Sequence, residues 1–153
     1  MAITYDASKI GGVIELLNDL LANYHVHFQK MRSYHWNVKG PSFFELHEKF
    51  EELYEDAYKK IDFIAERILA LGGKPVSTFT EYLQLSELTE SNGELADADM
   101  VQDTIQDLHL LIEKERLVAE KGLDALDSGT VEIIQHFIHE KEKSAWMLKA
   151  SIS

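Results

Sequence analysis

The sequence predicts an all-α fold in which four long helices form a bundle, with a short helix in a long crossover between the second and the third. Apolar residues recur at intervals of three and four over four separate stretches of the chain. Glycine, proline and Asn-Gly signals divide these stretches. One connection is long enough to let the second and third long helices run parallel, as in bundles with a single long crossover.

The first two long helices are predicted from periodicity and from their ends. Residues 8–35 carry apolar side chains on one face, and the turn at residues 37–41 ends this helix. Ser42 followed by Glu45 has the spacing of a capping box, which predicts that the second helix begins there. This helix is expected to run to Gly72, a typical C-terminal stop. It runs through the apolar residues Leu53, Ile61, Ile64 and Leu69.

The rest of the chain supplies the crossover and two further long helices. Pro75 opens the crossover, residues 79–85 have the pattern of a short helix, and residues 91–93 mark another break. The third long helix is predicted over residues 97–126 and the fourth over residues 130–150. In the third helix the expected inward residues are Val101, Ile105, Leu108, Ile112, Leu117 and Leu123. One domain, residues 1–153, accounts for the whole chain.

Composition restricts the possible classes of function. Fifteen Lys and Arg residues against 27 Asp and Glu residues give a net charge of −12, which favours metal cations over nucleic-acid phosphates as partners. Cysteine is absent, so a metal site must use histidine and carboxylate side chains. The N-terminal residues lack the pattern of an export signal, and no apolar stretch reaches the length of a membrane span. We therefore expect a cytoplasmic protein that does not engage membranes.

Four residues of the second helix have the chemistry and spacing of metal ligands. His47, Glu51, Asp62 and Glu66 fall within about 100° of one another around a helix, so they share one face. Glu51 and Asp62 nevertheless lie about 16 Å apart along the axis, which is too far for one iron cluster. If two copies of the helix cross antiparallel about a two-fold axis, the first pair of one copy meets the second pair of the other. The spacing predicts a metal site shared between subunits.

Residues of fixed type also recur at fixed spacings around the first turn and along the second helix. These are His35-Trp36-Asn37-Val38-Lys39-Gly40, Phe44, Leu46-His47, Phe50-Glu51, Asp62, Ile64-Ala65-Glu66-Arg67 and Leu71-Gly72-Gly73. This pattern extends over roughly 40 positions and closely resembles the Dps family of mini-ferritins, the DNA protection during starvation proteins. The resemblance covers all four helices. It implies a ferritin-like four-helix bundle that assembles into a hollow homododecamer.

The resemblance also assigns roles to individual residues. His35, His47 and Glu51 of one subunit, with Asp62 and Glu66 of its two-fold mate, would be the catalytic ligands of a ferroxidase centre that holds at most two iron ions. Glu66 would be the bridging carboxylate. The family most often has aspartate where this chain has Glu51, and the extra methylene changes the reach of that ligand. The family prefers hydrogen peroxide as the oxidant of Fe(II) and stores the ferric product as mineral, while zinc would be an inert substitute.

Four further positions and the remaining histidines have weaker sequence support. Trp36 either intercepts stray oxidising equivalents near the centre or is an interface aromatic. Glu120, Asp124 and Asp127 follow at i, i+4 and i+7 where the resemblance would place a three-fold pore for iron entry, and the alternative is a solvated acidic face. Surface or satisfied, partly buried positions are expected for His25, His27, His109, His136 and His139.

Two other functions stay open beside a peroxide-consuming ferroxidase. The first is a nucleoid protein that coats DNA, which some members of the family do through Lys- and Arg-rich tails. This chain shows no such tail, so we expect no direct DNA binding, although bridging cations could still support it. The second is a structural or immunogenic shell whose metal site binds zinc and is inert.

Overall fold

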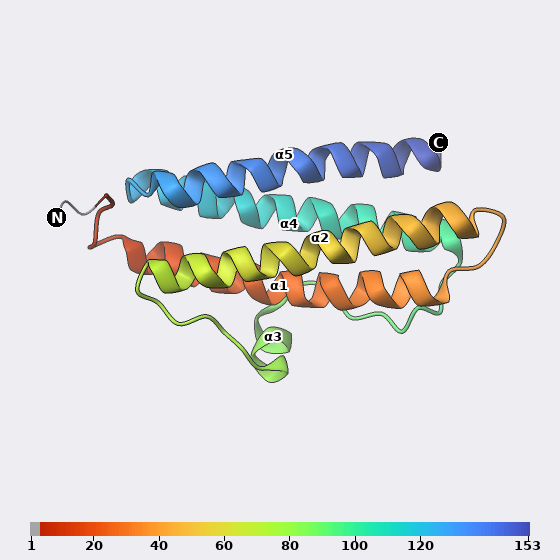
Figure 1. The fold of residues 1–153 in the computed structure, drawn as a ribbon, viewed down its shortest axis with the longest axis horizontal. Helices are drawn as coiled ribbons and strands as arrows, with labels where there is room; N and C mark the ends of the chain where they lie inside the picture. The colour runs from red at the N-terminus through yellow and green to blue at the C-terminus, as the bar shows by residue number, and fades with distance from the viewer. Residues whose placement is uncertain (1–3) are drawn as a thin grey trace.

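The computed structural model describes residues 4–153 and confirms the predicted all-α architecture. Four long helices lie side by side along the long axis of the molecule, and α3 lies outside them on the α1 side (Figure 1). The helices are α1 (Ile10–Asn37), α2 (Phe43–Ala70), α3 (Phe79–Leu85), α4 (Asp97–Asp124) and α5 (Ser128–Ser151). The crossover brings α4 back beside the start of α2, so α2 and α4 run in the same direction. No helix within residues 4–153 combines the length and apolar character needed to cross a bilayer.

The structure confirms two of the predictions made about helix ends and contradicts one. The short crossover helix has the predicted bounds, and Thr78 caps it by accepting a hydrogen bond from the Glu81 amide. Gly72 adopts φ +86°, the left-handed conformation expected just beyond the end of α2. The capping-box prediction at Ser42 is wrong, since its side chain accepts no capping hydrogen bond. Its backbone angles of φ −96° and ψ 22° depart from the extended conformation that aims a capping hydroxyl at the helix.

The core consists of two hydrophobic clusters that follow one another along the bundle. Most residues predicted to point inward from α4 are buried, but Leu117 and Leu123 are wrong, with exposed fractions of 52% and 61%. Each lies next to a residue that is buried instead. These buried neighbours are Val118 and Gly122. Adjacent residues differ by about 100° around a helix, so an apolar pair does not reveal from its spacing alone which member faces inward.

Candidate metal centre

His35 and His47 are held together by a reciprocal pair of hydrogen bonds across the α1–α2 turn. His35 Nδ1 lies 2.6 Å from the His47 carbonyl oxygen, and His47 Nδ1 lies 2.7 Å from the His35 carbonyl oxygen. A carbonyl oxygen only accepts, so both Nδ1 atoms carry the proton and donate. The two rings stack with centroids 3.8 Å apart. This arrangement leaves Nε2 of each imidazole available to a metal ion.

Glu51 adds a carboxylate to this pair of imidazoles. Its Oε1 lies 4.0 Å from His35 Nε2, and the Tyr54 hydroxyl donates a hydrogen bond to the same oxygen at 3.4 Å. Burial of the Tyr54 ring and the charge of Glu51 raise the pKa of Tyr54, so the hydroxyl keeps its proton. Sequence reasoning missed Tyr54. Its only signal was its position three residues after Glu51, which places both residues on one face of α2.

Asp62 and Glu66 form a second, separate group on α2. A side-chain hydrogen bond between the two carboxyl groups and the charge of Asp62 raise the pKa of Glu66. Both residues are exposed, and Asp62 follows Glu51 by about 16 Å along the helix. Within residues 4–153 of one subunit, no group of three or more His, Asp or Glu side chains is close enough to hold a metal ion. The five predicted ligands therefore lie as two incomplete groups on the surface of one chain.

Trp36 lies next to this site on the surface of α1. Its ring is 58% exposed, and the Arg32 guanidinium lies 4.9 Å from the ring centroid in a cation–π contact. The same guanidinium lies 5.3 Å from the centroid of Phe28, so the two aromatic rings and the cation form one row along α1.

The acidic residues at the end of α4 do not behave as one group. Glu120 and Asp124 are exposed, and Asp124 forms an ion pair with Lys9 at 3.3 Å. Asp127 is only 1% exposed. It caps α5 by accepting a hydrogen bond from the Thr130 amide and forms an ion pair with Arg67 at 2.6 Å. Within its own subunit the Asp127 carboxylate is thus buried and engaged with α5 and Arg67, unlike the exposed carboxylates of Glu120 and Asp124.

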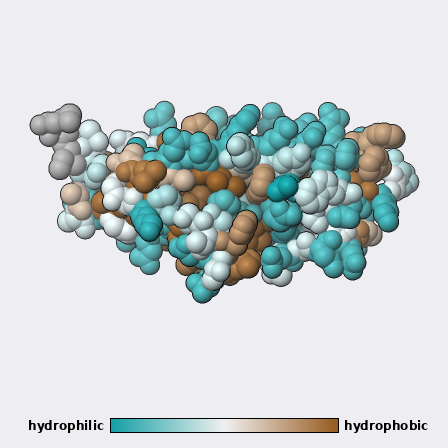
Figure 2. Space-filling model, turned by 60° about the horizontal axis from the view of Figure 1, so that its bottom comes forward, coloured by the Kyte–Doolittle hydropathy of each residue, from teal (hydrophilic) through white to brown (hydrophobic). Residues whose placement is uncertain are grey.

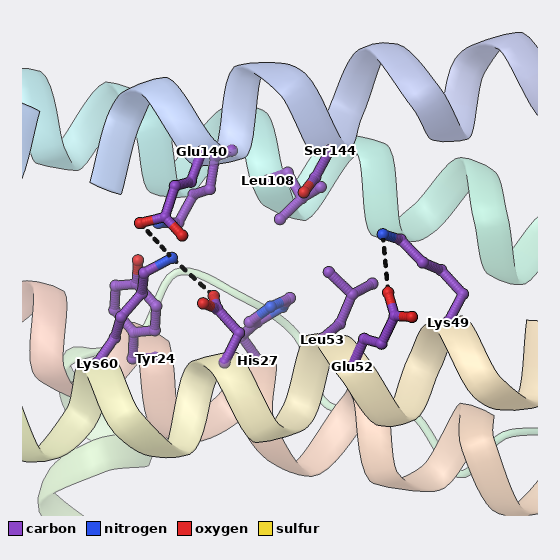
Figure 3. A pocket seen from close by; sticks show the side chains of 11 residues that line it. Tyr24, His27, Lys49, Glu52, Leu53, Lys60, Leu108, Glu140 and Ser144 are labelled. Atoms are coloured by element: carbon purple, nitrogen blue, oxygen red, sulfur yellow. Dashed lines mark hydrogen bonds and ion pairs between the residues drawn. The ribbon is translucent and has the colours of Figure 1, made fainter. Parts of the chain in front are cut away.

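A polar cavity of about 160 Å³ lies inside the bundle between α2 and α5 (Figure 3). On its α2 wall, Lys60 forms ion pairs with Asp56 at 2.7 Å and with Glu140 of α5 at 3.7 Å. On its α1 wall, His27 is 3% exposed, and its Nδ1 has no hydrogen-bond partner among residues 4–153. Burial lowers the pKa of His27 to about 3, so the ring is neutral. The expectation that every remaining histidine is satisfied is wrong for His27.

A fully buried ion pair lies beside this cavity. Lys141 Nζ lies 2.8 Å from Glu115 Oε2, and the Tyr24 hydroxyl donates to the same oxygen at 2.7 Å. Burial raises the pKa of Glu115 and lowers the pKa of Lys141 to about 8. Ferritin-like di-iron proteins with a centre inside one bundle place carboxylates and Glu-x-x-His ligands in this interior. Here ammonium groups neutralise the interior carboxylates, and the chain contains no Glu-x-x-His sequence. The interior is therefore unsuited to a metal ion.

An apolar groove of about 800 Å³ runs between α1 and α3. Phe79 and Leu83 on its α3 side are 82% and 51% exposed, and hydrophobic side chains gather on this face of the molecule (Figure 2). Phe28 lines both this groove and a second hollow that reaches Tyr54. The exposed apolar surface thus extends to the border of the His35 site. Surfaces of this kind mark interaction sites in soluble proteins.

Comparisons with known proteins agree with this fold. A family model described as a ferritin-like domain matches residues 14–153. DNA protection during starvation protein 2 of Bacillus anthracis is 44% identical over 142 residues, which cover 92% of this chain and 97% of that protein.

Solved structures resemble the whole chain as well. The crystal structure of a Dps protein from Vibrio cholerae O1, described as a member of a broad superfamily of ferritin-like diiron-carboxylate proteins, has a TM-score of 0.94 and 35% identity. The match covers 100% of this chain and 99% of that one. A Dps protein from Bacillus brevis gives a TM-score of 0.93 and 36% identity over 100% of both chains.

Proposed function

Because the chain belongs to the Dps family of ferritin-like proteins, a family associated with iron storage and protection, we propose that it is a ferroxidase. We propose further that its iron centres are shared across a two-fold subunit interface. The observation that carries this proposal is the division of the five ligands. His35 of α1 with His47 and Glu51 of α2 forms one incomplete group, while Asp62 and Glu66 form another farther along α2. An antiparallel two-fold pairing of α2 completes two identical centres at once.

The ligand set suits the oxidation of iron as a substrate. The free Nε2 atoms of His35 and His47 bind Fe(II), while three carboxylates favour the harder Fe(III) product. Two ferrous ions each give one electron to one hydrogen peroxide molecule. The O–O bond breaks, two protons are taken up and two water molecules form. No hydroxyl radical is released, and the ferric ions pass into a stored mineral.

A second copy of the chain is also the occupant that suits the apolar groove. The groove borders the His35 site, and pairing of two copies would cover the exposed side chains of Phe79 and Leu83 while it completes the centres. Family resemblance extends this pairing to a hollow homododecamer. Glu120 and Asp124 are then the carboxylates proposed to draw Fe(II) toward a three-fold pore.

A direct role in coating DNA is the weaker candidate. Relatives carry DNA protection in their names, but removal of Fe(II) and peroxide protects DNA without contact. The net charge of −12 opposes contact with phosphates. Gel retardation of plasmid DNA at low salt, with and without a divalent cation, separates direct binding from cation-bridged binding.

Co-expression of two inactive variants tests whether the centres are shared. His47→Ala and Asp62→Ala each remove one half of every centre. In a mixed pair, the intact His47 of one subunit meets the intact Asp62 of the other. Random pairing would therefore restore about a quarter of the wild-type centres. The readout is ferric absorbance after anaerobic loading with Fe(II) and addition of limiting peroxide. Shared centres predict inactive single variants and a partly active mixture that consumes one peroxide per two iron ions.

An inactive mixture with folded, assembled subunits would reject centres shared between subunits. Slow iron oxidation that is equal in the wild type and in both single variants would reject the ferroxidase itself. That outcome, together with tight zinc binding, would favour an inert shell.

A further inference from the structure

Tyr54 is a residue of the site to which neither the ligand pattern nor the family resemblance assigns a role. It lies on α2, three residues after Glu51, and its ring is fixed by two aromatic neighbours. The ring meets His35 edge-on with centroids 5.4 Å apart and meets Phe28 edge-on at 6.1 Å. A ring held between two side chains of α1 has a defined direction for its hydroxyl. That hydroxyl points at Glu51 Oε1.

Glu51 needs such a restraint more than the shorter aspartate would. Its side chain is 46% exposed and has one more rotatable bond than aspartate, so ordering it at a metal ion costs more conformational entropy. The same Oε1 lies 3.4 Å from the Tyr54 hydroxyl and 4.0 Å from His35 Nε2. Tyr54 therefore selects the conformers of Glu51 that lie beside the imidazole. The other carboxylate oxygen, Oε2, makes no hydrogen bond within residues 4–153.

We propose that Tyr54 is a positioning residue that holds Glu51 beside His35 Nε2, so that the longer carboxylate reaches the same metal ion as the imidazoles. The proposal rests on the function proposed above and extends it to a residue that does not touch the metal. Partners of metal ligands contribute about 10–100-fold to metal affinity. At 3.4 Å the hydrogen bond lies near the long end of the usual range, so it restrains the Glu51 carboxylate without holding it rigidly.

Fe(II) binding under anaerobic conditions tests this role without requiring oxidation. Tyr54→Phe keeps the ring and removes only the hydroxyl, so we expect Fe(II) affinity to fall about tenfold. In the peroxide assay, the half-saturating Fe(II) concentration should rise by a similar factor while the maximal rate changes little. Tyr58→Phe is the matched control, because Tyr58 lies one turn further along α2, is 68% exposed and makes no hydrogen bond within residues 4–153. It should behave as the wild type.

The Glu51→Asp background separates positioning from a general structural effect. Aspartate is one methylene shorter and is not expected to reach the Tyr54 hydroxyl, so Tyr54→Phe should add no further loss there. An unchanged affinity in Tyr54→Phe, or an equal loss in the Glu51→Asp background, would overturn the proposal. A wild-type protein that binds Fe(II) but does not oxidise it would refute the ferroxidase function, and the Tyr54 comparison would still be decided by the binding data.

Discussion

Replacing Lys141 with methionine tests the energetic role of the buried ion pair inside the bundle. The Lys141 side chain is 4% exposed and the Glu115 side chain is completely buried, with 2.8 Å between Nζ and Oε2. Methionine has a similar length and keeps the apolar part of the packing. The substitution therefore removes the charge and leaves the Glu115 carboxylate with one hydrogen-bond partner within residues 4–153, the Tyr24 hydroxyl.

The expected cost follows from stranding a carboxylate in the core. Removal of one partner of a buried ion pair typically costs about 3–5 kcal/mol. For a chain of this size, each kcal/mol lowers the Tm by about 2–4 °C, so Lys141→Met should lower it by about 6–20 °C. Burial already raises the pKa of Glu115, and without Lys141 the folded state binds its proton more strongly than the unfolded chain does. The deficit relative to the wild type should therefore shrink as the pH falls from 7 to 5.

A compensating variant provides the control. Lys141→Met with Glu115→Leu replaces both charges by apolar groups, which is often neutral or stabilising for buried pairs. The Tm of this double variant should lie well above that of Lys141→Met alone. Thermal unfolding followed by circular dichroism, at equal protein concentration, is the assay. A loss below about 1 kcal/mol in the single variant, or a double variant at least as unstable as the single one, would refute the reasoning.

Three further predictions concern the ends and the interior of the helices. Asp127→Ala removes both the cap of α5 and the partner of Arg67, so it should lower the unfolding free energy by about 2–4 kcal/mol. Asp127→Asn can still cap the helix and should lower it less. Equal losses for the two variants in urea titrations would contradict this. His27 has a pKa of about 3 when folded and takes up its proton near pH 6.5 when unfolded, so stability should fall as the pH drops from 6.5 toward 3. His27→Leu should reduce that fall by up to about 1.4 kcal/mol per pH unit, and an unchanged pH dependence would show that His27 is not the cause. Leu126 adopts φ 57° and is 68% exposed, so Leu126→Gly should raise the unfolding free energy by about 1 kcal/mol. A lower Tm of this variant would show that the leucine makes contacts that outweigh its backbone strain.

Most of the fold could be read from the sequence because it depends on local patterns. Periodicity located all four long helices and the short helix from Phe79 to Leu85. Turn residues located the breaks between the helices. The errors arose where the pattern is degenerate. Leu117 precedes Val118, and only packing against other helices decides which of the two is buried. Lysines such as Lys60 and Lys141 were not expected inside, because an amphipathic pattern places charges on the solvent side.

For the site too, features set by local sequence could be predicted, whereas contacts between residues distant in the chain could not. The shared face of His47, Glu51, Asp62 and Glu66 follows from helix geometry alone. His35 was a further candidate upstream of them, and its place in the same group came from the family resemblance. The ion pair between Asp127 and Arg67 could not be predicted, because the two residues lie 60 positions apart in the chain and such a contact leaves no local signal. Sequence spacing also could not reveal that the backbone carbonyls of His35 and His47 fix the tautomers of both rings. The sharing of the centres between subunits stays a prediction.

The packing of the bundle has a consequence for the order in which the chain folds. Main contacts join α1 to α2, α4 to α5 and α1 to α4, whereas α2 and α5 face each other across the polar cavity. Each antiparallel pair is adjacent in sequence and closes over a short loop, so we expect both hairpins to form rapidly and independently. Their docking along the α1–α4 seam then buries Glu115 against Tyr24 and desolvates a charge late in the reaction. The barrier to folding should accordingly lie at the meeting of two preformed hairpins, with the long crossover acting as a tether.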